Sequence, residues 1–159
     1  MVSIRAVLLI GTIQINNFLP SSCLSSIATF RAMSMNASPS AKRLAGRIEV
    51  KNSGEPTVNA VYEERNPTSV PEGFSRTCKS MRWQPDEMWE RLSDGRKPWF
   101  EASNESYIYW NRGDGKWWID GPSGAGLYIV SSPESSPPSE GWVALSGARQ
   151  PVPVLEVLA

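Results

Sequence analysis

Histidine is absent from this chain of 159 residues, and cysteine occurs only twice. Without histidine the chain can form neither a Ser-His-Asp or Cys-His nucleophilic site nor a metal site with imidazole ligands. Two cysteines, Cys23 and Cys78, are too few for a cysteine-rich zinc site. We therefore expect no metal, no cofactor and no enzymatic activity, and we interpret Cys78 as a small buried apolar residue.

Acidic residues are missing from the first 47 positions, which contain five basic residues. Because the chain has 16 residues of each sign, the remaining 11 basic residues face 16 acidic ones in residues 48–159, a net charge of −5. The basic residues of this acidic part are scattered among carboxylates. Binding to a phosphate backbone requires clustered Lys and Arg, so the sequence predicts no nucleic-acid partner.

A long hydrophobic run is also lacking, since the apolar stretch 6–15 has ten residues and a bilayer span needs about 20. The order of a basic start, a short apolar run and small residues is that of a signal peptide. Residues 28–46 are rich in Ser and Ala, basic and free of acids, like a transit peptide. With Phe30, this arrangement resembles the bipartite leaders of plastid proteins in algae with secondary plastids. We predict a leader over residues 1–46 and a plastid location, with mitochondrion, secretion or a buried N-terminal helix as alternatives, and no transmembrane segment in the mature chain.

The remainder, residues 47–158, is predicted to be a single β-rich module. Thirteen Pro and twelve Gly favour many turns and short elements. One helix is expected at 85–92, where Pro85 and two acids precede an apolar face, and residues 63–74 are expected to form a loop. Alternating or β-prone runs predict strands at 47–52, 58–62, 107–111, 116–120, 127–131, 142–145 and 154–158. The expected fold class is mainly β: a small antiparallel sheet or open barrel with one short helix.

Aromatic residues dominate the predicted hairpin formed by residues 107–111 and 116–120. Neighbouring residues of a strand point to opposite faces, so Trp117 and Trp118 make both faces of this hairpin aromatic. Either the helix and the Pro-rich loops cover the second face, or part of the aromatic set forms a binding surface. The candidate surface comprises Trp99, Tyr107, Tyr109, Trp110, Arg112, Lys116, Trp117 and Trp118.

The order of these motifs resembles a tryptophan-rich β-repeat module of algal and protist proteins. The residues that carry the resemblance are Asn59, Tyr62, Arg96, Pro98, Trp99, Tyr109, Trp110, Gly115, Trp117 or Trp118 with Ile119, Tyr128, Pro137, Pro138, Gly141 and Trp142. The resemblance covers one copy, about residues 48–157, and this chain departs from it by an insert at about 73–92. It implies a β fold and a binding or scaffolding role, and it supplies no catalytic residues.

The functional prediction is a non-catalytic module that binds another protein, inside an organelle. A carbohydrate-binding module that uses exposed Trp and Tyr is the alternative. An enzyme that uses carboxylates is a third hypothesis, for which Asp114 and Asp120 are the obvious pair. A strand rises about 3.3 Å per residue, so these two acids should lie too far apart for a glycosidase pair, and we interpret them as loop and strand-end acids.

Overall fold

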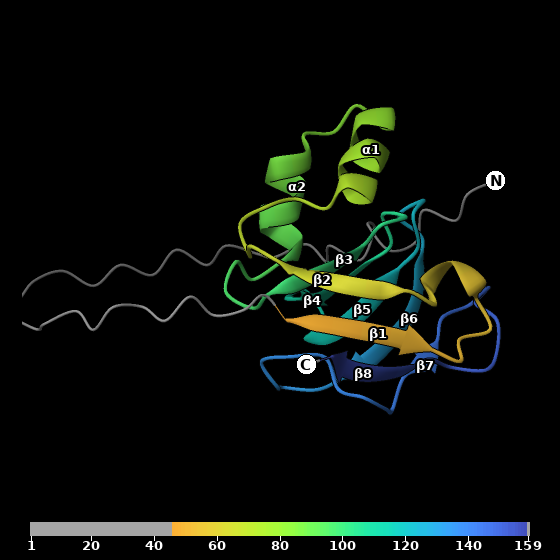
Figure 1. The fold of residues 1–159 in the computed structure, drawn as a ribbon. Helices are drawn as coiled ribbons and strands as arrows, with labels where there is room; N and C mark the ends of the chain where they lie inside the picture. The colour runs from red at the N-terminus through yellow and green to blue at the C-terminus, as the bar shows by residue number, and fades with distance from the viewer. Residues whose placement is uncertain (1–45, 159) are drawn as a thin grey trace, which may run out of the picture. The chain divides into compact units, whose positions relative to one another are not determined.

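The computed structural model describes residues 46–158, which form an eight-stranded antiparallel sheet with two short helices on one side (Figure 1). In chain order the elements are β1 (Arg47–Lys51), the 3-10 helix η1 (Pro56–Val58), β2 (Val61–Arg65), α1 (Glu72–Ser80), α2 (Pro85–Leu92), β3 (Trp99–Ala102), β4 (Tyr107–Asn111), β5 (Lys116–Asp120), β6 (Gly126–Ser131), β7 (Val143–Ala144) and β8 (Val154–Leu158). The prediction of a mainly β fold is confirmed. The predicted leader lies outside the described residues except for Gly46, and it stays a prediction.

The sheet has the strand order β7-β6-β5-β4-β3-β2-β1-β8. Strands β1 to β7 therefore follow one another as a meander, and β8 returns to pair with β1. The sheet curls into a half-barrel whose edges are β7 and β8. Residues 132–142, which we call the β6–β7 strap, lie against the β8 edge, where the Leu155 N–H donates to the Ser139 carbonyl over 2.9 Å.

The hairpin of β4 and β5 has the predicted bounds and pairs Tyr109 with Trp118. Its loop ends at Gly115, whose φ of 68° lies in the left-handed region that glycine adopts without steric cost. The Asn111 side chain accepts the Gly113 N–H over 2.8 Å inside the loop. The glycine and the Asn111 side chain therefore account for the tight loop between β4 and β5.

The helix α2 has the predicted bounds and buries Trp89. The prediction of only one helix is wrong, because α1 occupies the end of the expected loop at 63–74 and continues to Ser80. This segment contains glycine, serine and threonine, which are weak helix formers, and its buried face shows only Phe74 and Cys78 besides Gly73. Packing of those side chains on the sheet, rather than local propensity, stabilises α1.

The strand predicted at 58–62 is displaced, since Val58 ends η1 and β2 covers Val61–Arg65. The last three residues of β2 are charged, so the pattern of apolar residues did not indicate a strand there. Pairing with β3 holds it in the sheet, and its Arg65 contacts Glu101 with an Nε–Oε2 distance of 3.4 Å.

The curled sheet packs apolar side chains on both faces. The concave face encloses Ile48, Val50, Val58, Tyr62, Phe100, Ala102, Ile108, Trp117, Ile119, Tyr128, Val130, Trp142 and Leu155. The opposite face and the helices enclose a second group, the hairpin-side cluster, made of Phe74, Cys78, Trp89, Trp99, Tyr107, Tyr109 and Trp118. The module therefore has two cores separated by one sheet.

Candidate functional site

The helices α1 and α2 form a helical hairpin (residues 72–92) that covers the aromatic face of the sheet. The Trp89 ring is central, with ring centroids 5.2 Å from Phe74, 5.2 Å from Tyr109 and 5.8 Å from Trp99. The segment before α1 joins this cover, because the Trp99 indole N–H donates to the Asn66 carbonyl over 2.8 Å. Tilted and edge-on ring pairs of this kind stabilise a core beyond the area that they bury.

The eight predicted surface residues do not form one exposed aromatic surface. Five of the six aromatic side chains are buried, with exposed fractions of 7% or less: Trp99, Tyr107, Tyr109, Trp117 and Trp118. The helical hairpin covers four of these rings, and the concave core holds Trp117. Trp110 and Lys116 are partly exposed and Arg112 is exposed, at the tip of the β4–β5 hairpin. The predicted residues do not form one surface because side chains alternate along β4 and β5, which divides the rings between two covered faces.

Lys97 contacts two of the aromatic rings on the concave face, Trp110 and Trp117. Its ammonium lies 4.1 Å from the Trp110 ring centroid and 5.5 Å from that of Trp117. The same Nζ donates to the carbonyl oxygens of Pro133 and Glu134, over 3.1 and 2.8 Å. Lys97 therefore fastens the β6–β7 strap over the concave core, and this ammonium site is filled from within the chain.

A pocket of about 430 Å³ lies where α2 meets the segment before α1 and the β4–β5 turn. Its lining combines apolar and charged side chains: Pro67, Thr68, Val70, Asp86, Trp89, Glu90, Ser93, Asp94, Gly95 and Arg112. This volume falls in the range of small-ligand sites, about 300–1,000 Å³. It is large enough for one or two amino-acid side chains.

The charges of this pocket are unbalanced. Three carboxylates, of Asp86, Glu90 and Asp94, stand against the Arg112 guanidinium, which leaves a net charge of −2. Asp94 is fixed by accepting the Arg96 N–H over 2.9 Å. Within the described range 46–158, the Asp86, Glu90 and Arg112 side chains make no hydrogen bond or ion pair. Their charged atoms are therefore available to a ligand.

A second polar feature lies under α1. Asp120 ends β5 and is only 3% exposed. Burial raises the pKa of its carboxyl to about 7, and the neighbouring Tyr107 hydroxyl opposes part of that rise. Burial also raises the pKa of Tyr107 and Tyr109 well above the ordinary value, and the charge of Asp120 adds to both shifts. The carboxyl is therefore almost completely shielded from solvent.

Among residues 46–158, no three acidic or cysteine side chains are placed to hold a metal ion. Asp114 lies in the loop before β5, whereas Asp120 is the last residue of that strand. The Asp114 carboxylate also accepts the Trp118 indole N–H over 3.1 Å. Burial raises the pKa of the Cys78 thiol, which disfavours the nucleophilic thiolate.

Comparisons with protein-family models, with curated proteins and with solved structures found no match. The resemblance to tryptophan-rich β-repeat modules therefore remains a prediction. No helix within residues 46–158 is long and apolar enough to cross a bilayer. The function has to be argued from the pocket and its charges.

Sequence reasoning missed the pocket residues. Asp86 was interpreted only as an acid near the positive end of the α2 dipole, and Glu90 and Asp94 carried no special pattern. Arg112 is the one predicted residue that also lines the pocket. The available signal was weak: Asp86 and Glu90 are four residues apart, and so share one face of α2.

Proposed function

We propose that this chain is a non-catalytic protein-binding module whose pocket receives a basic side chain of a partner protein. The observation that carries the proposal is the pocket at α2, where the carboxylates of Asp86 and Glu90 have no partner within the described residues. Unpaired carboxylates beside an apolar wall favour a ligand that is cationic at one end and apolar along its length.

Arginine and lysine have that form. Their methylene stems can pack on Val70, Pro67 and the Trp89 ring while the charged head stays at the carboxylates. Arginine fits better, because its planar guanidinium bonds two carboxylate oxygens at once. The Arg112 guanidinium supplies donors for a carbonyl or carboxylate of the same partner segment.

The carbohydrate alternative has less support. Sugar rings bind on exposed aromatic faces, and among the aromatic side chains of the range 46–158 only Trp83 and Trp110 are even partly exposed. The small exposed apolar side chains are Val61, Val143 and Val157, which are 42%, 59% and 78% exposed. Valine does not provide a flat stacking surface.

Peptide titration of the full chain, followed by two-dimensional ¹H–¹⁵N NMR, tests the proposal. The probe is a nonapeptide of Gly and Ser with one central arginine, and the matched probe carries neutral citrulline instead. We expect the arginine peptide to shift the amide signals of residues 86–95 and the citrulline peptide to leave them in place. Since a hydrogen bond to a charged group contributes about 1.5–3 kcal/mol, the double variant D86N/E90Q should bind at least about tenfold more weakly.

The control variant is E72Q/E87Q, which removes two carboxylates from the same helical hairpin without touching the pocket lining. We expect it to keep its affinity within about twofold, because exposed charges outside the pocket act only through screened interactions. Equal binding of the two peptides, or equal losses in the two double variants, would contradict the assignment of this pocket.

A further inference from the structure

Asp120 lies buried in the hairpin-side core beside the Tyr107 hydroxyl, which offsets only part of the cost of burial. Its Oδ1 has no partner at hydrogen-bond geometry within the described residues, and neither does the Tyr107 hydroxyl. Tyr107 is the residue paired with Asp120 across β4 and β5, and its exposed fraction is 0%. A β-bulge between Ile119 and Asp120 interrupts the ladder at this point. Burying a carboxyl in this way costs stability that the fold does not regain locally.

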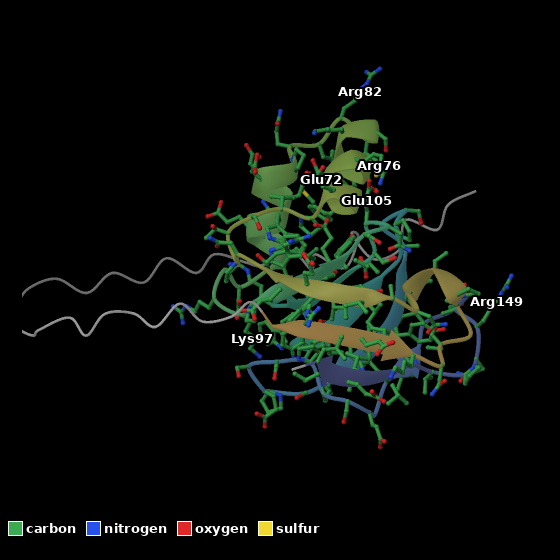
Figure 2. All side chains as sticks on the ribbon, in the orientation of Figure 1. Glu72, Arg76, Arg82, Lys97, Glu105 and Arg149 are labelled. Atoms are coloured by element: carbon green, nitrogen blue, oxygen red, sulfur yellow. The ribbon has the colours of Figure 1, made fainter. Side chains whose placement is uncertain are left out.

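The element that covers Asp120 is α1. The Thr77 hydroxyl donates to the Ser123 carbonyl, over 3.0 Å, in the turn that follows β5. A Cβ at Gly73 would lie 2.7 Å from the Glu105 carbonyl oxygen and 3.1 Å from that of Pro122, so α1 approaches the two turns closely. Arg76 pairs with Glu105 at the rim of this contact (Figure 2). The α1 cover is therefore held at its rim by a few polar contacts with turns.

Among the residues that the structure describes, no cation balances an ionised Asp120. The titratable groups that face it are Tyr107 and Tyr109 from β4 and, next to Tyr107, Cys78 from α1. The pKa of each is raised, so all three are neutral near pH 7. The turn 121–125 contains no titratable residue, and α2 contributes only Trp89, Met88 and Leu92 to this core.

We propose that Asp120 is a proton-dependent lock on the helical hairpin: protonated Asp120 keeps the hairpin closed on the sheet, and ionised Asp120 favours a state in which the hairpin is lifted. Lifting would expose the aromatic face of the sheet and let water solvate the carboxylate. Because α2 carries Asp86, Trp89 and Glu90, lifting would also dismantle the pocket. This last consequence rests on the proposed function, and the lock itself does not.

The sign and range of the effect follow from the two protonation equilibria. In the closed state the pKa of Asp120 is about 7, and a solvated Asp has the ordinary pKa of 3.8. The closed state therefore holds a proton that the open state releases between about pH 4 and pH 7. The opening constant rises with pH in this window and levels off above it, and the linkage relation gives about a 50-fold rise from pH 5 to pH 7.

Thiol labelling reports the opening directly, because Cys78 lies in the covered core and is 2% exposed. The full chain with Cys23→Ser leaves Cys78 as its single thiol, and 4,4′-dithiodipyridine reacts over the whole pH range. The matched protein adds Asp120→Asn, which cannot ionise and has the same thiol chemistry. We divide the labelling rate of the Cys23→Ser protein by that of the protein that also carries Asp120→Asn. We expect this ratio to rise about 50-fold from pH 5 to pH 7.

Hydrogen exchange of the unmodified chain provides a second measurement that needs no substitution. We expect amides of residues 72–92 to open more readily than those of β1 and β8 at every pH, and their opening constant to follow the same rise. A rate ratio that stays constant with pH would overturn the proposal. Equal opening constants in the helical hairpin and in β1 and β8 would also overturn the proposal, because Asp120 would then affect global unfolding and not a local opening of the hairpin. Neither measurement involves a partner, so a failed peptide titration would reject the pocket and leave the lock standing.

Discussion

The substitution Asp120→Asn tests the energetics of the buried carboxyl in the whole fold. Asparagine keeps the shape of the side chain and cannot ionise. The pKa of Asp120 rises from the ordinary 3.8 to about 7 on folding, because burial disfavours the charged form. The folded chain thus binds a proton that the unfolded chain releases, so the free energy of unfolding falls as pH rises from about 4 to 7 and stays flat above that. About three pKa units at about 1.4 kcal/mol each give about 4 kcal/mol.

Urea denaturation followed by tryptophan fluorescence measures this quantity. The parent chain and the Asp120→Asn variant are compared at half-unit steps from pH 4 to pH 8, so that all other titrating groups cancel in the difference. We expect the stability of the parent, relative to the variant, to fall by about 4 kcal/mol across this range. We also expect the variant to be the more stable protein at pH 8. If the free energies of unfolding of the two proteins change in parallel with pH, the reasoning is refuted. Water or a rearranged hydrogen-bond donor would then solvate the carboxylate in the folded chain.

Two further stability predictions concern the concave core and a backbone contact. Lys97→Met removes the ammonium over Trp110 and its bonds to the strap, so urea denaturation should show a loss of about 1–3 kcal/mol. Lys79→Met, an exposed lysine of α1, should change stability by less than about 0.5 kcal/mol, and an equal loss in both would show that the strap contact contributes nothing. Gly54→Ala would place a Cβ 2.1 Å from the Gln150 carbonyl oxygen, and a backbone clash should cost more than about 2 kcal/mol. Gly121→Ala, whose Cβ would meet the Leu127 side chain at 3.3 Å, should cost less in the same urea denaturation, and the reverse order would refute the contact.

The proposed lock and the proposed pocket share one structural element. The helical hairpin supplies the cover of Asp120 through α1 and a wall of the pocket through α2. A buried, unbalanced carboxyl lowers stability, and natural proteins tolerate such losses mainly where they serve function. This is the physical reason to test the two sites together, with peptide titrations at pH 5 and pH 7 on the same sample.

The sequence allowed only part of the candidate site to be predicted. Arg112 was assigned to the candidate surface, and its position between the two predicted strands 107–111 and 116–120 places it in the connecting turn, where Gly and Asp are typical. Trp99, Tyr107 and Trp118 were assigned to a dense aromatic region, and their burial depends on both helices, of which local patterns marked only α2. The pocket acids gave only a weak signal, the four-residue spacing of Asp86 and Glu90, since carboxylates on a short helix are ordinarily solvated. A pocket is a property of three segments that meet, 67–70, 86–95 and Arg112, and no single segment encodes it.

The sequence by itself determined the local elements: the helix at Pro85–Leu92, the strands Tyr107–Asn111, Lys116–Asp120 and Val154–Leu158, and the glycine loop of the hairpin. Side-chain periodicity, proline geometry and turn residues act within a few positions, so these features are legible in one dimension. The tertiary structure alone decided the existence of α1, the closing of the concave core by the strap, and the burial of Asp120. Each of these depends on which face is covered by a distant segment, and burial, unlike propensity, is set by contacts between residues far apart in the chain.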